Sequence, residues 1–177
     1  MDLVVSTDQS GNIEVWDPES QELPTDGRLS FEMLSETDYY KLAVDETFAL
    51  AMEFSRDWQL LAVYGRDNKI RVFHFKSGRL ICTIDESLEA LTRVQEEATD
   101  ELVLIENPAD FTAKMQGYKE AMRSWESMDR ASMPSLVFDE TSSLLIYSSP
   151  IGVKTASVAT GQTLRVYGKG ELGDFYL

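Results

Sequence analysis

The residues best suited to chemistry are scarce in this chain. Its 177 residues include one histidine, His74, and one cysteine, Cys82. A single histidine excludes sites built on histidine pairs, and the Gly-x-Ser-x-Gly turn that would present a nucleophilic serine is absent. A single cysteine forms neither an internal disulfide nor a four-cysteine metal site. We therefore expect no catalytic residue and no metal ligand, and a structural role for the Cys82 thiol.

Two motifs match ligand-binding patterns only in part. Residues 6–17 have the oxygen spacing of a calcium loop, but serine stands first and Pro18 follows at once, which favours a turn between strands. Gly168, Gly170 and Gly173 have the spacing of a dinucleotide fingerprint, which also needs a helix and an acidic residue about 20 positions later. Four residues follow Gly173, so we expect no cofactor.

Acidic residues dominate the composition. Thirty-one Asp and Glu against sixteen Lys and Arg give a formal net charge of −15. Such a field repels phosphate backbones, so direct nucleic-acid binding is not expected, and proteins are the expected partners. The acidic cluster of Glu96, Glu97, Asp100 and Glu101 would need burial to act as an acid–base pair. We expect it to be solvated.

The remaining composition indicates a folded, intracellular protein. Hydrophobic residues make up 43% and aromatic residues 10% of the chain, enough for a core. No apolar run approaches the roughly 18 residues of a membrane helix, and the N-terminal residues lack the pattern of a secretory signal. We expect a reducing compartment and no membrane contact.

Short strands separated by turns recur along the chain. These elements would position the candidate residues named above. Residues 49–84 form the complete unit, residues 134–167 repeat it, and residues 3–34 contain a partial copy with 28–33 as its last strand. Four short antiparallel strands with tight turns are typical of a propeller blade. The four strands predicted for the complete unit are Ala49–Phe54, Gln59–Tyr64, Ile70–Phe75 and Arg79–Ile84.

Two segments have helical rather than strand periodicity. Residues 36–44 predict a short helix, and residues 87–129 predict an amphipathic helical hairpin with apolar residues at steps of three and four. This hairpin either packs on the neighbouring strands or binds a partner. For the second interpretation the candidate docking residues are Met115, Met122 and Trp125.

Four residues resemble structural positions of WD40 repeats. Trp16 and Asp17 match the Trp-Asp pair that ends the third strand of such a repeat, and Phe73 takes the tryptophan position in the middle unit. Asp67 stands where these blades have a turn aspartate that bonds the backbone. We assign these four residues structural roles.

The order of further motifs narrows the resemblance. Gly65-x-Asp67-x-Lys69 leads into a strand pair, Asp85-Glu86-Ser87-Leu88 opens the helical segment, and Val137-Phe138-Asp139 follows it. Over about residues 3–170 this order resembles the WD-repeat half of the cyclophilin-type peptidyl-prolyl isomerases that also contain WD repeats. The resemblance implies a nuclear protein with spliceosomal partners. It places the isomerase domain outside these residues, since the Phe-His-Arg and Gln-Gly-Gly-Asp motifs are absent.

These observations predict an all-β fold, a partial WD40 β-propeller of about two and a half blades with an inserted α-helical hairpin. Its parts would be a blade remnant at 3–34, a complete blade at 49–84, a helical insertion at 87–129 and a blade at 134–167. Such an arc does not close, so we expect a fragment that needs the rest of its own propeller.

The expected function is a non-catalytic scaffold that binds proteins. The alternative is a self-contained acidic enzyme or small-molecule-binding domain of mixed fold.

Overall fold

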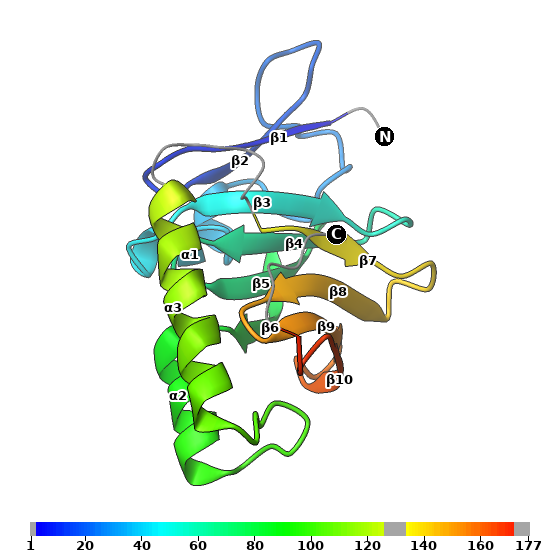
Figure 1. The fold of residues 1–177 in the computed structure, drawn as a ribbon. Helices are drawn as coiled ribbons and strands as arrows, with labels where there is room; N and C mark the ends of the chain where they lie inside the picture. Colours follow the sequence, from blue (N-terminus) through cyan, green and yellow to red (C-terminus); the bar gives the residue numbers. More distant parts are fainter. Residues whose placement is uncertain (1–2, 126–133, 172–177) are drawn as a thin grey trace.

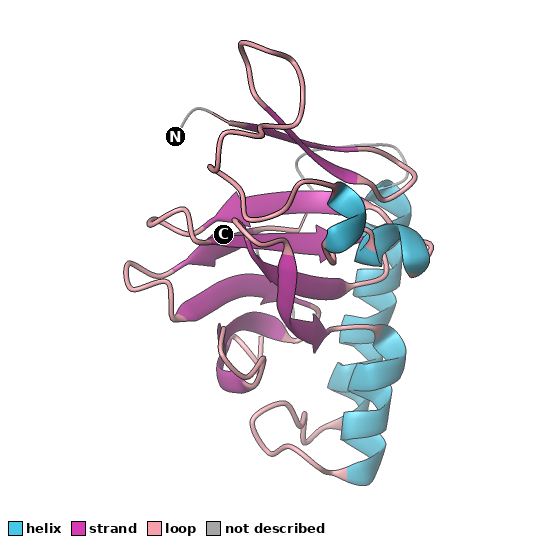
Figure 2. Ribbon diagram, turned by 180° about the vertical axis from the view of Figure 1, so that it is seen from behind, coloured by secondary structure: helices cyan, strands magenta, loops and turns pink. Residues whose placement is uncertain are grey.

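Three antiparallel sheets lie beside a group of helices (Figure 1). The computed structural model describes residues 3–125 and 134–171. Within these ranges the helices gather along one side of the sheets, as the view from behind also shows (Figure 2). Gly173 and residues 126–129 of the expected helical hairpin lie outside the described residues.

The first sheet has two strands, β1 (Val4–Thr7) and β2 (Ile13–Trp16). In the turn between them, the carboxylate of Asp8 accepts hydrogen bonds from the backbone N–H of Ser10 at 2.9 Å and of Asn12 at 3.0 Å. Gly11 completes the turn with a φ of +84°. The prediction of a turn that connects two strands here is confirmed.

The second sheet contains β3 (Ala49–Phe54), β4 (Leu60–Gly65), β5 (Lys69–His74) and β6 (Arg79–Asp85) in that order. The strand predictions for 49–84 are confirmed to within one residue. Alternate residues of β4 pack on opposite faces: Leu61 and Val63 face the first sheet and its loops, while Ala62 and Tyr64 face the third sheet. Burial on both faces explains why this stretch is almost continuously apolar.

The third sheet contains β7 (Leu136–Phe138), β8 (Leu144–Ser149), β9 (Gly152–Ser157) and β10 (Thr163–Tyr167), with β7 and β10 at its edges. Strand β7 lies next to β3 of the second sheet (Figure 1). The main core fills the space between these two sheets. Its buried members include Tyr64, Val72, Ile84, Leu145, Tyr147 and Ala156.

The helices are the 3-10 turn η1 (Leu34–Glu36), α1 (Lys41–Val44), α2 (Leu88–Glu97) and α3 (Pro108–Trp125). Ser87 caps the N-terminus of helix α2, because its hydroxyl accepts a hydrogen bond from the Ala90 N–H at 3.2 Å. A cluster of Leu91, Val103, Ile105, Met115 and Ile151 joins the helices to the third sheet. The helical hairpin is confirmed as α2 and α3 where the structure describes it, although residues 98–107 belong to neither helix. The helix predicted over 36–44 is confirmed only for its last four residues, which form α1, while residues 37–40 are not helical.

The all-β class and the partial WD40 propeller are wrong as a description of the fold. The described residues form a mixed α/β structure with sheets of two, four and four strands, and no closed propeller is present in them. Helices α2 and α3 share a core with Ile151 next to β9, so they are integral to the fold. Residues 28–33 form no fourth strand, because Ser30 bonds to the Lys76 carbonyl and Phe31 packs on Tyr39.

No helix within residues 3–125 and 134–171 has the length and apolar character needed to cross a membrane.

Candidate functional site

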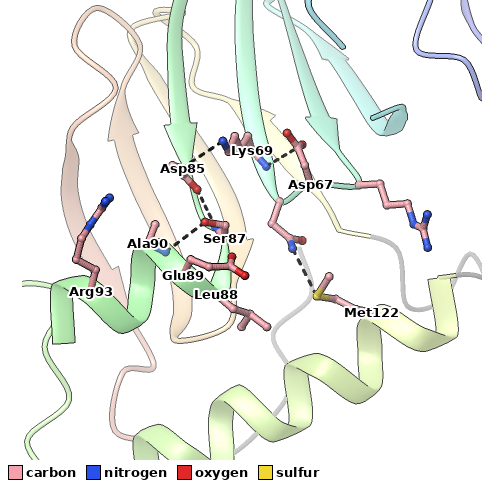
Figure 3. A pocket seen from close by; sticks show the side chains of 11 residues that line it. Asp67, Lys69, Asp85, Ser87, Leu88, Glu89, Ala90, Arg93 and Met122 are labelled. Carbon is pink, nitrogen blue, oxygen red and sulfur yellow. Dashed lines mark hydrogen bonds and ion pairs between the residues drawn. The ribbon is translucent and has the colours of Figure 1, made fainter. Parts of the chain in front are cut away.

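A pocket of about 550 Å³ lies where the second sheet meets the two long helices (Figure 3). The turn between β4 and β5 forms one wall, the end of β6 and the start of α2 form a second, and Met122 of α3 closes a third. The lining residues are Arg66, Asp67, Asn68, Lys69, Asp85, Ser87, Leu88, Glu89, Ala90, Arg93 and Met122. Charged side chains thus surround a small apolar surface made by Leu88, Ala90 and Met122.

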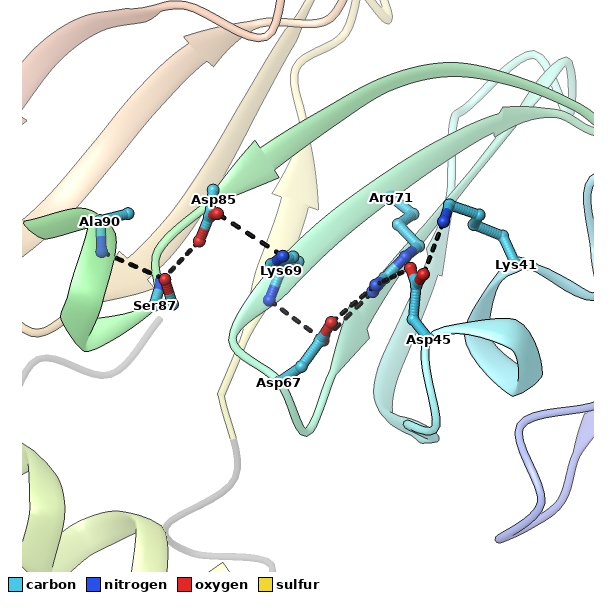
Figure 4. A network of polar contacts seen from close by, with 8 residues as sticks. All are labelled: Lys41, Asp45, Asp67, Lys69, Arg71, Asp85, Ser87 and Ala90. Atoms are coloured by element: carbon cyan, nitrogen blue, oxygen red, sulfur yellow. Dashed lines mark hydrogen bonds and ion pairs between the residues drawn. The ribbon is translucent and has the colours of Figure 1, made fainter.

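Asp67 fixes the β4–β5 wall through a chain of ion pairs (Figure 4). Its carboxylate accepts hydrogen bonds from both terminal nitrogens of Arg71, at 2.6 and 3.1 Å, and from the Lys69 N–H at 3.3 Å. Arg71 also donates to Asp45 at 2.6 Å. Burial by itself would lower the pKa of Arg71, but the two carboxylates more than offset it and the pKa is raised. The Asp67 carboxylate therefore has a structural role, because its bonds to Arg71 and Lys69 hold the turn between β4 and β5.

Asn68 connects the same wall to α3. This residue is 4% exposed and has a φ of +60°. Its side-chain oxygen accepts a hydrogen bond from the Tyr118 hydroxyl at 2.7 Å, and its amide nitrogen lies 3.4 Å from the Met122 sulfur. The Tyr118 hydroxyl is also 3.1 Å from that of Tyr64. Burial raises the pKa of both tyrosines, so both hydroxyls keep their protons and remain available as donors.

A buried ion pair that the sequence pattern did not predict lies behind the pocket. Glu86, directly after β6, and Lys154 of β9 are each 2% exposed, and the Lys154 Nζ lies 2.8 Å from both Glu86 oxygens. The hydroxyls of Tyr147 and Ser149 donate to the same carboxylate at 2.8 and 3.0 Å. One available sequence signal is Lys154, a charged residue in the middle of a predicted strand. The pair joins the second and third sheets.

The other three residues expected in structural positions differ in their surroundings: Phe73 lies in the core, Asp17 in a polar turn, and Trp16 on β2 with 36% of its surface exposed. Phe73 is fully buried against Tyr39. The Trp16 indole donates to the Ser6 hydroxyl at 2.9 Å. Asp17 accepts hydrogen bonds from the N–H groups of Ser20 and Glu19 and pairs with Arg28, and these contacts lower its pKa to about 2.

Of the three candidate docking residues, the structure describes the side chains of Met115 and Met122. Met115 is 7% exposed and lies in the core shared by the helices and the third sheet, so it is not at the surface. Met122 is half-buried at the edge of the pocket. The side chain of Trp125 lies outside the described residues. Docking through Met122 and Trp125 stays a prediction.

His74, Cys82 and the acidic cluster lie in separate places. The Nδ1 atom of His74 is 3.0 Å from the Ser77 hydroxyl at the end of β5. Cys82 is half-buried in β6, and burial raises the pKa of its thiol. Glu96, Glu97 and Glu101 are exposed, and Asp100 is half-buried. Among the described residues, no group of three or more His, Cys, Asp and Glu side chains has the arrangement of a metal site.

Comparison with known proteins shows that the sequence of this chain is similar to those of peptidyl-prolyl isomerases. No family model matches the chain. "Peptidylprolyl isomerase domain and WD repeat-containing protein 1" of Mus musculus and that of Homo sapiens are each 32% identical to it over 168 residues, 95% of this chain and 25% of theirs. "Peptidyl-prolyl cis-trans isomerase CYP71" of Arabidopsis thaliana is 32% identical over 176 residues, 99% of this chain and 27% of its own. The chain thus spans about a quarter of the length of these relatives.

These comparisons correct three functional expectations. We expected the WD-repeat half of an isomerase family, a non-catalytic scaffold and no enzymatic role. The relatives that match nearly the whole chain are named as peptidyl-prolyl isomerases, and the described residues contain no closed propeller. The names assign no residue of this chain to the reaction. What the comparisons establish is a similarity, over nearly all of this chain, to about a quarter of each of several peptidyl-prolyl cis-trans isomerases.

Proposed function

We propose that the protein functions as a peptidyl-prolyl cis-trans isomerase. The observation that carries this proposal is the similarity, over 95–99% of the chain, to proteins named for that activity. Because the matched region is about a quarter of each relative, the activity is proposed for the protein as a whole and not for a particular side chain of the described residues.

The reaction is a rotation about the peptide bond that precedes proline. The barrier is about 18–20 kcal/mol, and uncatalysed exchange takes tens to hundreds of seconds. A catalyst holds the proline ring in an apolar surface and stabilises the twisted amide with hydrogen-bond donors placed in advance. No bond is made or broken, so the chemistry needs no metal or redox cofactor.

The pocket beside α2 is where this chain should be examined for peptide contact. Within the described residues it brings the apolar side chains of Leu88 and Met122 next to the charged groups of Arg66 and Arg93. The buried Glu86–Lys154 pair and the α3 contacts hold its walls. A fixed, partly apolar surface of this kind suits the binding of an extended polypeptide.

The direct test is the exchange rate of a capped Ala-Pro peptide, measured by NMR exchange spectroscopy with the protein at its full native length. The proposal predicts a rate that rises in proportion to protein concentration. A rate equal to that of the peptide alone would overturn it. The same measurement on residues 1–177 determines whether these residues carry the activity themselves.

Protein partners, those of the splicing machinery among them, and a nuclear location are further proposals. They rest on the family resemblance alone. Co-purification from a nuclear extract, with splicing proteins identified by mass spectrometry, tests both. Recovery in a non-nuclear fraction without those proteins would contradict them.

A further inference from the structure

We propose that the pocket beside α2 binds a basic side chain, lysine or arginine, of a partner polypeptide. This inference concerns the same pocket as the proposed peptide contact, but it does not depend on the isomerase activity. It rests on the shape of the pocket, on the ion pairs and hydrogen bonds that its charged groups already form, and on the net charge of the chain.

One carboxylate in the pocket has no side-chain partner among the described residues. Asp67 is bound by Arg71, and Asp85 lies 3.6 Å from the Lys69 ammonium and accepts a hydrogen bond from the Ser87 N–H at 3.0 Å. Glu89 has no side-chain hydrogen bond or ion pair to any residue in 3–125 or 134–171. In Figure 3 its carboxylate points from α2 toward Met122. Glu89, in the first turn of α2, therefore supplies a carboxylate that no described side chain pairs with.

Within residues 3–125 and 134–171, none of the cations that line the pocket forms an ion pair with Glu89. The guanidinium of Arg66 lies over the Phe48 ring, 5.7 Å from its centroid. The ammonium of Lys69 faces Asp85. Arg93 lies one turn after Glu89 on α2 and forms no ion pair with it in the part of the chain that the structure describes (Figure 3). An arriving cation would thus meet the Glu89 carboxylate without displacing an existing ion pair.

The apolar part of the lining suits the rest of such a side chain. Lysine and arginine carry three or four methylene groups below the charge, and these gain from contact with apolar surface. Leu88, Ala90 and Met122 offer that surface next to Glu89. The volume of about 550 Å³ accommodates the side chain together with a short stretch of its backbone.

The charge of the whole chain favours the same occupant. A formal net charge of −15 attracts cationic segments and raises the rate at which they encounter the surface. The general field alone would give no preference for one acidic residue over another. The local arrangement around Glu89 predicts such a preference, and this difference makes the proposal testable.

The test is an NMR titration of the protein with the capped peptide Gly-Gly-Arg-Gly-Gly. Saturable shifts are expected at the Ala90 amide and the Met122 methyl group. The matched peptide with citrulline, which keeps the shape of arginine without its charge, is expected to bind about five-fold more weakly, as for loss of a partly exposed ion pair. Equal affinity for the two peptides would overturn the proposal.

Matched variants separate the pocket from the general field. Glu89→Gln and Glu97→Gln each remove one exposed charge from α2, at opposite ends of the helix. The proposal predicts about five-fold weaker binding for Glu89→Gln and unchanged binding for Glu97→Gln. Met122→Ala should weaken binding while leaving the preference for arginine over citrulline intact. Equal losses in the two glutamine variants, or shifts spread over the whole acidic surface, would contradict it. Amide spectra of each variant verify that the fold is unchanged.

Discussion

The Nζ atom of Lys154 lies 2.8 Å from both carboxylate oxygens of Glu86, and each residue is 2% exposed. A buried pair of this kind recovers its desolvation cost only through close contact and further hydrogen bonds. Here Tyr147 and Ser149 supply two of these bonds. The pair therefore fixes the third sheet against the end of β6.

Removing one partner of this pair should destabilise the fold strongly. Lys154→Met leaves the Glu86 charge buried without its cation, and we expect a loss of about 3–5 kcal/mol in the free energy of unfolding. Urea denaturation followed by circular dichroism measures it. The double variant Glu86→Leu with Lys154→Met should be less destabilised than the sum of the single variants. Additive losses would show that the two side chains are not coupled.

Helix α3 should loosen when the Tyr118 hydroxyl is removed. Tyr118→Phe deletes the bond to Asn68 at 2.7 Å and the contact with Tyr64 at 3.1 Å, leaving buried polar groups unsatisfied. We expect a loss of about 1–3 kcal/mol, together with faster amide hydrogen exchange in α3. The control is Tyr40→Phe, because Tyr40 is 40% exposed. Unchanged exchange in α3 would mean that these bonds do not hold the helix.

Gly11 should tolerate a side chain far less than Gly27 does. Both have positive φ, +84° and +85°, so the backbone strain of an alanine is matched. A Cβ on Gly11 would lie 2.3 Å from the Thr47 carbonyl oxygen, whereas one on Gly27 would meet nothing within 4 Å. We expect Gly11→Ala to cost about 2 kcal/mol more than Gly27→Ala in thermal or urea unfolding. Similar losses would contradict the close approach between the first sheet and the α1–β3 loop.

Asp17 should contribute to acid sensitivity. Its pKa falls from 3.8 to about 2 on folding, mainly through the hydrogen bond from the Ser20 N–H and the contact with Arg28. The stabilisation is therefore complete above pH 3.8 and is lost as the pH falls toward 2. The unmodified protein should have a higher free energy of unfolding than Asp17→Asn above pH 3.8. This difference should become smaller as the pH falls toward 2. A gap that stays constant with pH would contradict the lowered pKa.

Much of the local structure could be predicted from sequence because it depends on nearby residues. The strands of 49–84 follow from alternating apolar residues and short turns, and the start of α2 follows from Ser87. The class of the fold could not be predicted this way. It depends on α2, α3 and Ile151 forming a shared core, which brings together residues distant in sequence.

The candidate site shows the same division between local and distant contacts. The turn aspartate Asp67 was recognised, but its partner proved to be Arg71, reinforced by Asp45 from a different loop. Glu86 and Lys154 are 68 positions apart, and no local pattern links them. The pocket likewise takes its walls from two turns and two helices. Such sites become visible only when the sheets are placed against one another.

The cis–trans exchange rate of a capped Xaa-Pro peptide in the presence of the full-length native protein tests the central functional claim most directly. We expect acceleration that grows linearly with protein concentration and disappears when the protein is heat-unfolded. Exchange at the uncatalysed rate, with a protein whose spectra show it to be folded, would contradict it.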